Sequence, residues 1–229
     1  MGTGVARQRP ARRIVAQTFS HHIDKIIKGA GLLAPLGLVG VVAAISYWFS
    51  PSYTDVGYQP LQPVPVSHAL HAGELGLDCR YCHSSVEKGA SAAVPPTQTC
   101  MNCHGWVKTD SEQLQPVRDS WESGNPVPWT RVHMLPDYAY FDHSIHVAAG
   151  VGCKSCHGRI DQMEVVYQAE PLSMGWCLDC HRNHEPHLRP LDEVTNMEYD
   201  PATAGYDPAA DPERTRELNP PVHCSGCHR

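Results

Sequence analysis

The chain has 229 residues, of which 10 are cysteine and 20 are proline, whereas only 3 are phenylalanine. A chain of this length ordinarily buries a large aliphatic and aromatic core, and this composition supplies such a core poorly. The formal net charge of −6 argues against a nucleic-acid-binding protein. The charge is uneven, because residues 1–28 hold six basic residues and one acid. The two parts of the chain are therefore expected to face different surroundings.

A run of 20 residues without charge, at positions 30–49, follows this basic segment. At about 1.5 Å per residue, a helix of this length spans the hydrocarbon core of a bilayer. We predict a transmembrane anchor over residues 29–50, with residues 1–28 in the cytoplasm and the remainder on the periplasmic or extracellular side of the cytoplasmic membrane. A cleaved secretory signal is the alternative, but the run is longer than a signal core and ends in Tyr-Trp-Phe.

All ten cysteines occur in Cys-x-x-Cys pairs, and a histidine directly follows each pair. Two thiols at this spacing form thioethers with the vinyl groups of one haem, and the next histidine becomes an iron ligand. Zinc ribbons, disulfides and thioredoxin-like redox motifs do not require that histidine. We therefore predict five covalently bound haem c groups, whose porphyrins take the place of a side-chain core.

We number these motifs 1 to 5 in chain order, at residues 79–83, 100–104, 153–157, 177–181 and 224–228. The predicted thioether residues are Cys79, Cys82, Cys100, Cys103, Cys153, Cys156, Cys177, Cys180, Cys224 and Cys227. The predicted proximal iron ligands are His83, His104, His157, His181 and His228. No catalytic residue is predicted.

The haem domain is expected over residues 67–229, after a proline-rich extended spacer at 51–66. Within the domain a unit recurs at 67–104 and 142–181, each copy with a His-x-x-His pair followed by two motifs. Histidines at i and i+3 share one helix face, so each pair can reach two irons on that side. The expected fold class is a multihaem cytochrome c, mostly irregular, with short helices around five haems and one N-terminal transmembrane helix.

Two further segments are expected at the surface of this domain. Residues 191–221 are rich in proline and acidic residues and are interpreted as a surface loop. His184 and His187, in the turn before this segment, are interpreted as surface residues.

The unit of a His-x-x-His pair followed by a haem motif resembles the class III multihaem cytochromes of the c3 and c7 type. A more specific resemblance is to the pentahaem cytochrome c component of the bacterial alternative complex III. It is carried by the anchor, the five motifs, and residues 131–137, 141–143, 171–177 and 223–229.

That resemblance implies an electron-transfer subunit, not itself an enzyme, within a respiratory or photosynthetic complex that oxidises menaquinol. The implied partners are an iron–sulfur subunit, quinol-binding integral membrane subunits and a monohaem cytochrome c subunit. Electrons would pass on to a periplasmic cytochrome c, a copper protein or a terminal oxidase.

The resemblance also implies distal iron ligands on the side opposite the motif histidines. His68 would serve the haem of motif 1 and His143 the haem of motif 3, while His71 and His146 would each reach a haem further along the chain. His133 is the fifth predicted distal ligand, and a methionine in its place would raise one haem potential above the others. The alternative distal candidates are Met163, Met174 and His223.

Two other functions remain open at this point. A NapC-type quinol dehydrogenase also joins a membrane helix to several haems, but its first haem lies close to the membrane, whereas about 30 residues separate Phe49 from Cys79 here. A multihaem redox enzyme needs an iron with an open distal position, often marked by an unusual proximal residue such as lysine. All five motifs here end in histidine, which favours electron transfer.

Overall fold

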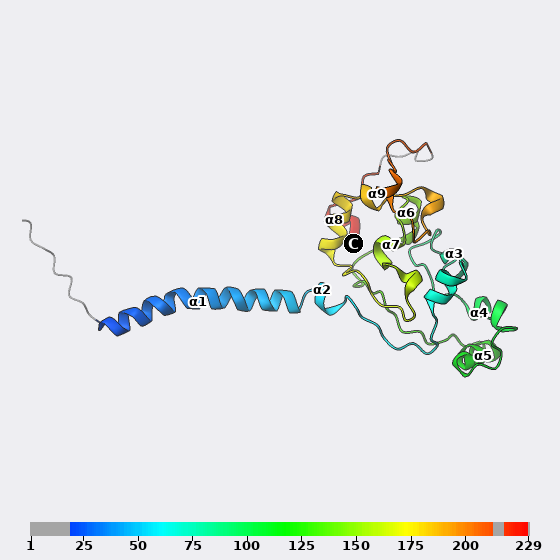
Figure 1. Ribbon diagram of the computed structural model, residues 1–229, viewed down its shortest axis with the longest axis horizontal. Helices are drawn as coiled ribbons and strands as arrows, with labels where there is room; N and C mark the ends of the chain where they lie inside the picture. The colour runs from blue at the N-terminus through cyan, green and yellow to red at the C-terminus, as the bar shows by residue number, and fades with distance from the viewer. Residues whose placement is uncertain (1–18, 213–217, 229) are drawn as a thin grey trace, which may run out of the picture. The chain divides into compact units, whose positions relative to one another are not determined.

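A computed structural model describes residues 19–212 and 218–228, and Figure 1 shows its ribbon. The chain divides into two units, with the boundary between Phe49 and Ser50. Four of the basic residues used to predict the membrane orientation, Arg7, Arg9, Arg12 and Arg13, lie outside the described residues.

The first unit contains one long helix, α1 (His21–Trp48), with Pro35 in its interior. The Ser20 side chain caps it by accepting a hydrogen bond from the backbone N–H of Ile23. The helix begins before residue 29, where the anchor was expected, because the cap lies at Ser20 and a Lys28–Asp24 ion pair supports its first turns. By length and composition α1 suits a membrane anchor or a signal peptide.

The second unit is built from short helices joined by irregular segments (Figure 1). In chain order they are α2 (Pro51–Thr54), η1 (Ala69–Glu74), α3 (Cys79–Cys82), α4 (Thr97–His104), η2 (Glu112–Leu114), α5 (Gln115–Ser123), α6 (His143–Ala148), α7 (Lys154–His157), η3 (Ile160–Gln162), α8 (Met174–Arg182), η4 (Glu185–His187), η5 (Leu191–Glu193), α9 (Pro201–Ala204) and α10 (Cys224–Cys227). Helix η1 is a turn of π-helix, and the other η elements are 3-10 turns. In the described part of the chain, β pairing is limited to an isolated bridge between Val151 and Leu188.

Each haem motif either forms a single helical turn of its own or lies at the C-terminal end of a slightly longer helix. The backbone N–H of the motif histidine bonds to the carbonyl of the first cysteine in motifs 1, 3 and 5, at 2.9, 3.0 and 2.8 Å. This turn is closed locally, so it needs no long helix around it. The predicted architecture of short helices in an otherwise irregular domain is confirmed.

Buried apolar side chains are few in the described part of the haem domain. They are Val64, Val117, Val127, Met163, Leu188, Val194 and Met197. A domain of this length normally buries many more such side chains. The shortage agrees with a core that is supplied mainly by bound cofactors.

The segment predicted as a spacer lies along the haem domain instead of standing clear of it. The backbones of Gly57 and Tyr58 bond to that of Gln168, at 2.8 and 3.1 Å. The Gln62 side chain donates to the carbonyl of Thr130 and accepts from its N–H, at 2.8 and 3.0 Å. Val64 is buried beside these contacts. The alternating prolines keep the segment extended, but its free backbone and amide groups find partners on the domain.

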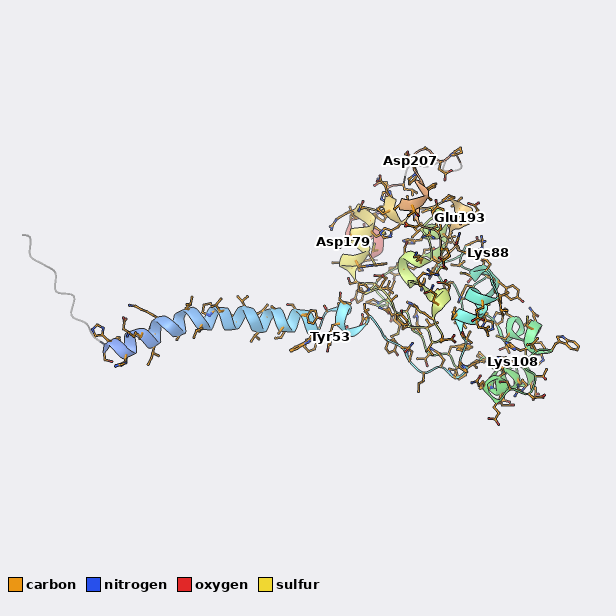
Figure 2. All side chains as sticks on the ribbon, viewed as in Figure 1. Tyr53, Lys88, Lys108, Asp179, Glu193 and Asp207 are labelled. Atoms are coloured by element: carbon orange, nitrogen blue, oxygen red, sulfur yellow. The ribbon has the colours of Figure 1, made fainter. Side chains whose placement is uncertain are left out.

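The proline-rich segment at 191–221 is also more than a surface loop. Val194 and Met197 are buried within it, and the side chain of Arg189, just before it, is buried and donates to the carbonyl of Asn196 at 2.8 Å. The described part of this stretch is therefore only partly exposed, and Figure 2 marks Glu193 and Asp207 along it. The acidic composition of this segment therefore did not indicate that two of its apolar side chains, Val194 and Met197, are buried.

Candidate functional site

The five motifs lie in a spatial series that differs from their order in the chain. The Cys79 and Cys153 thiols lie close together, so motifs 1 and 3 are neighbours. Cys82 lies near Cys100, which joins motif 2 to motif 1.

On the other side of motif 3, Cys156 lies near both cysteines of motif 4. Cys177 of motif 4 in turn lies near Cys227 of motif 5. The spatial order of the motifs is therefore 2, 1, 3, 4, 5, in which the two repeated units meet through their first motifs.

Hydrogen bonds reinforce the junctions in this series. Between motifs 1 and 2, the Asn102 side chain donates to the Tyr81 hydroxyl at 3.1 Å. Between motifs 1 and 3, the backbone N–H of Cys153 bonds to the carbonyl of Val194 at 3.1 Å, and Thr195 donates to the Asp78 carboxylate at 2.9 Å. Residues 194–195 thus bridge two motifs that are 74 positions apart in the sequence.

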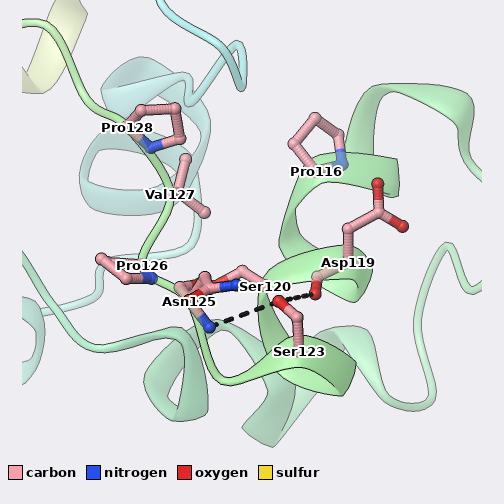
Figure 3. Close-up of a pocket in the computed structure, with 8 residues that line it drawn as sticks. All are labelled: Pro116, Asp119, Ser120, Ser123, Asn125, Pro126, Val127 and Pro128. Atoms are coloured by element: carbon pink, nitrogen blue, oxygen red, sulfur yellow. Dashed lines mark hydrogen bonds between the residues drawn. The ribbon is translucent and has the colours of Figure 1, made fainter.

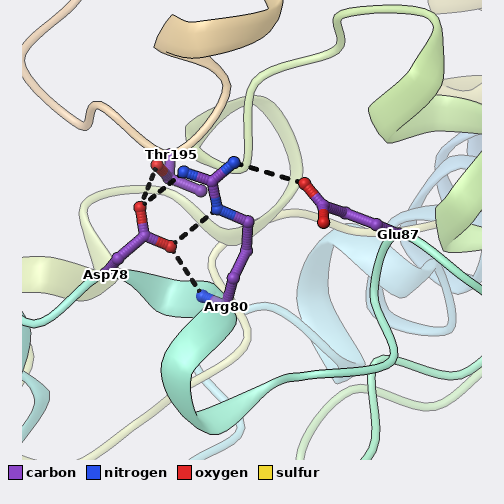
Figure 4. A network of polar contacts seen from close by, with 4 residues as sticks. All are labelled: Asp78, Arg80, Glu87 and Thr195. Carbon is purple, nitrogen blue, oxygen red and sulfur yellow. Dashed lines mark hydrogen bonds and ion pairs between the residues drawn. The ribbon is translucent and has the colours of Figure 1, made fainter.

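A polar network holds the start of motif 1, as Figure 4 shows. Asp78 caps α3 by accepting from the backbone N–H of Arg80, and the Arg80 guanidinium also pairs with Asp78 and with Glu87. The hydrogen bonds from Arg80 hold the pKa of Asp78 well below the usual range. These side chains are about 40% exposed, so the ion pairs themselves contribute only about 0–1 kcal/mol. Their role is to fix the orientation of α3.

Four motif histidines donate a hydrogen bond from Nδ1 to a backbone carbonyl. His83 donates to Ala93 at 2.7 Å, His104 to Val107 at 3.1 Å, His181 to Pro221 at 2.7 Å and His228 to Tyr138 at 2.9 Å. A carbonyl only accepts, so the proton is on Nδ1 and Nε2 keeps its lone pair for a metal. This is the hydrogen bonding expected of histidines that ligate iron.

The His-x-x-His histidines are held in the same way. His71 donates to Ser67 at 2.8 Å, His143 to Ala90 at 2.8 Å and His146 to Asp142 at 2.7 Å. The fourth, His68, has a buried Nδ1 without a partner. Burial, followed by the nearby His83 and His71, lowers the pKa of His68 to about 4. His68 is thus neutral at pH 7 and lies close to the motif 1 histidine.

The distances between imidazole rings match pairs that share one metal ion. Ring centres are 6.2 Å apart for His71 and His104, and 6.2 Å apart for His146 and His181. For His143 and His157 the separation is 6.4 Å, with planes at 10°. Metal–nitrogen bonds of about 2 Å put the nitrogens of two opposed imidazoles about 4 Å apart, and the ring centres about 6 Å apart. The residues therefore fit haem iron with two axial histidines.

His133 occupies a different position from the other predicted distal residues. Its Nε2 lies 3.3 Å from Nδ1 of His157, and the two ring centres are 4.5 Å apart. It therefore lies on the Nδ1 side of the motif 3 histidine, away from the Nε2 that is predicted to ligate iron. Burial, followed by the neighbouring His133, lowers the pKa of His157 to about 3, and burial also lowers the pKa of His133. Both rings are neutral at pH 7.

The alternative distal candidates differ widely in their surroundings. Met163 is 4% exposed, and its carbonyl accepts from the N–H of His68 at 3.0 Å. Met174 is 68% exposed, and His223 is the exposed residue that precedes α10. The ring contact of His228 is with Tyr138, at 5.8 Å between centres.

The two histidines expected at the surface are both half-buried. His184 has a buried Nδ1 without a partner, and burial lowers the pKa of His187. The turn that carries them therefore packs against the domain more closely than its polar sequence indicated.

Phe141 is a structural residue of the site, whereas the sequence interpretation used it only as part of the family-like segment 141–143. Its ring centre lies 4.7 Å from that of His143 and 4.5 Å from that of His146. Asp142 caps α6 by accepting from the N–H of Ser144 at 2.8 Å. An aspartate directly before a His-x-x-His pair is a recognisable helix-start signal, but the stacking of Phe141 depends on how the chain folds.

Other uses of the cysteines do not fit the geometry. None of the ten thiols is paired in a disulfide. Among the residues that the structure describes, no cluster of three or more histidine, cysteine, aspartate or glutamate side chains is arranged to hold a metal ion directly. A zinc ribbon would require such a cluster.

A cavity of about 250 Å³ beside α5 is not part of this site (Figure 3). It is lined by Pro116, Asp119, Ser120, Ser123, Asn125, Pro126, Val127 and Pro128. Because its walls contain neither cysteine nor histidine, it has no group that attaches or ligates haem.

Comparison with known proteins identifies the same class of site. Residues 139–229, which contain the second His-x-x-His pair and motifs 3 to 5, match the family model described as cytochrome c7 and related cytochrome c. Over 180 residues the chain is 29% identical to the menaquinone reductase multihaem cytochrome c subunit of Nitratidesulfovibrio vulgaris. That alignment covers 69% of this chain and 84% of the relative.

The predicted fold class, a multihaem cytochrome c, is thereby confirmed, and this fold implies covalently bound haem c. The relative is a subunit of a menaquinone reductase. Neither similarity distinguishes the alternative complex III from other quinol-linked complexes, so that finer assignment stays a prediction.

Proposed function

We propose that this chain is a membrane-anchored pentahaem cytochrome c that conducts electrons from a quinol-oxidising membrane complex to an acceptor on the periplasmic side. One observation carries the proposal: five attachment motifs lie in a single unbroken series, and paired imidazoles stand at the metal-sharing distance beside three of them. Sites in such a series suit transfer along the domain, whereas an enzyme needs one distinct site for its substrate.

The chain's own residues have three roles in this function. The ten motif cysteines would tie the porphyrins to the backbone, and the motif histidines would present Nε2 as iron ligands. His68, His71, His143 and His146 would supply further iron ligands. Haem c, when bound, provides an iron that gains or loses one electron without atom transfer. The carbonyl acceptors keep the imidazoles that donate to them in one tautomer and orientation, which limits reorganisation when the charge of the iron changes.

The α1 helix would serve as an uncleaved anchor in this function. Its length suits a membrane span, and the basic residues before its apolar part favour a cytoplasmic N-terminus. The relative's role in a menaquinone reductase supports assembly with quinol-handling subunits. We propose a complex of the alternative complex III type, with an iron–sulfur subunit, integral quinol-binding subunits and a monohaem cytochrome c. The acceptor would be a cytochrome c, a copper protein or a terminal oxidase.

The test begins with the haem content of the purified full-length chain. Intact mass and haem quantification should give five covalent haems, and replacing both cysteines of one motif by alanine should remove one. A wild-type chain with fewer than five haems would contradict the pentahaem assignment.

A second measurement separates a conduit from a quinol dehydrogenase. The chain alone, mixed with reduced menaquinol in detergent, should be reduced slowly, whereas the intact complex should reduce the same haems rapidly. Rapid reduction of the isolated chain would overturn the proposed conduit function in favour of a NapC-type quinol dehydrogenase. Turnover of nitrite or hydroxylamine by the isolated chain would instead identify a redox enzyme.

A further inference from the structure

We propose that His133 is a positioning residue of motif 3: its imidazole accepts a hydrogen bond from Nδ1 of His157 and lowers the reduction potential of the haem held by Cys153 and Cys156, without binding iron itself. This inference rests on the proposed function only in requiring haem at motif 3.

The first support is the contrast between His157 and the other motif histidines. Four of the five donate from Nδ1 to a backbone carbonyl, whereas His157 meets the Nε2 nitrogen of another imidazole at 3.3 Å. The planes of the two rings are nearly perpendicular, at 78°, which is an edge-on arrangement. A neutral imidazole has one N–H donor and one acceptor nitrogen, so a hydrogen bond at this contact has one ring as donor and the other as acceptor.

The direction of this hydrogen bond follows from what His157 must do. To ligate iron through Nε2, neutral His157 carries its proton on Nδ1, and Nδ1–H is then the donor. His133 Nε2 is the acceptor, so its own proton lies on Nδ1. The arrangement fixes the tautomers of both rings.

The distances also separate His133 from the ligands of iron. The other ring pairs of the site have centres 6.2–6.4 Å apart, and His157 already has such a partner in His143. His133 is at 4.5 Å from His157, on its Nδ1 side. Its Nε2 is the nitrogen that makes this contact, so as the acceptor it does not bind a metal.

The chemical consequence follows from the basicity of the acceptor. A neutral imidazole nitrogen has a conjugate acid with a pKa of about 6.5, so it is a far stronger base than a backbone carbonyl oxygen. It therefore draws the Nδ1 proton of His157 further away and makes His157 a more basic ligand. A more basic axial ligand stabilises ferric iron and lowers the potential.

The place of motif 3 in the series gives this residue its effect on the whole domain. Motif 3 joins the pair of motifs 2 and 1 to the pair of motifs 4 and 5. A change in potential there alters the step between the two repeated units. The first unit has no matching histidine pair, since the motif 1 histidine, His83, donates to the carbonyl of Ala93.

The test compares His133→Leu, which removes the acceptor, with His133→Asn and His133→Gln, which offer an amide oxygen. Met134→Ala, at an exposed neighbouring residue, is the matched control. Each full-length variant is loaded with haem, its haem content is confirmed by mass, and it is then titrated by spectroelectrochemistry and examined by EPR in the oxidised state.

We expect all variants to keep five haems and only low-spin iron. In His133→Leu one of the five one-electron steps should move to higher potential by about 59 mV, a tenfold change in its oxidation equilibrium. The Asn or Gln variant should recover part of that shift, and Met134→Ala should leave all five steps in place. If His133→Leu does not load haem, the test is made with the Asn and Gln variants, in which the same one-electron step should move to higher potential by a smaller amount.

Two results would overturn the inference. The appearance of one high-spin haem in the His133 variants would make His133 a distal ligand, as the sequence interpretation held. Unchanged potentials and EPR signals in all three variants would show that His133 serves only in packing. Neither result alters the haem count on which the proposed function depends.

Discussion

Replacing Phe141 by alanine should weaken two distal ligands at once. The Phe141 ring contacts both His143 and His146, with ring centres 4.7 and 4.5 Å away. Each aromatic contact of this kind contributes about 0.5–1.5 kcal/mol beyond the burial of area. Because 1.4 kcal/mol is a factor of ten, the loss of one contact should shift each ligand from bound toward dissociated by about 2- to 12-fold.

Cyanide binding to the oxidised protein measures this shift directly. Cyanide displaces a distal imidazole, so its apparent affinity increases by the factor by which the imidazole binds more weakly. In Phe141→Ala the affinity should increase by about 2- to 12-fold at two haems, those of motifs 3 and 4, and should stay unchanged at the others. Trp106→Ala, at a side chain that is 89% exposed, is the control for loss of an aromatic residue.

Two outcomes would refute this reasoning about Phe141. An equal increase at all five haems would show a general loosening of the domain. Unchanged affinity at every haem would show that the ring contacts do not hold the histidines. Phe141→Leu, which keeps most of the volume but not the aromatic edge, should give an intermediate increase.

The remaining predictions concern a ligand, a close backbone contact and acid stability. His71→Ala should convert one haem, that of motif 2, to high spin in the optical and EPR spectra, and five low-spin signals would remove His71 from the ligand set. Gly73→Ala should destabilise the domain by about 1–3 kcal/mol in chemical denaturation, because a Cβ there would lie 2.5 Å from the backbone carbonyl oxygen of Asp161. Gly89→Ala, where nothing lies within 4 Å, should cost little, and equal losses in the two variants would contradict the packing argument. The pKa of His157 is lowered to about 3, so its contribution to stability is complete above pH 6.5 and falls as the pH drops toward 3, while the unfolded state takes up the proton. Acid unfolding followed by haem absorbance measures this loss, and stability that is flat between pH 6 and 4 would exclude it.

Much of the site was predictable because its chemistry is local. The spacing Cys-x-x-Cys-His is set by one helical turn, and the structure forms that turn at every motif. The pairing of each His-x-x-His unit with two motifs also follows from short-range geometry, and His71 and His146 stand at the metal-sharing distance from His104 and His181. That pairing remains a prediction until the ligands are measured.

The docking of residues 57–66 was not predictable from the proline pattern. Prolines indicate an extended segment but do not say whether it pairs with another part of the chain. Here the partners of Gln59 and Gln62 are the backbones of Val165 and Thr130, which are 106 and 68 positions away. The same limit applies to residues 191–221, where the buried Val194 is hidden in an acidic stretch.

The sequence by itself determined the number of Cys-x-x-Cys-His motifs and the repeated unit, since these depend on residue types at fixed short spacings. The tertiary structure alone decided the spatial order 2, 1, 3, 4, 5 and the distant acceptors behind several of the imidazoles. His181 donates to a carbonyl 40 positions away and His228 to one 90 positions away. His133 reaches His157 in the same way, from 24 positions earlier in the chain. Contacts between distant segments depend on the packing of the whole chain, and a local sequence pattern does not encode them.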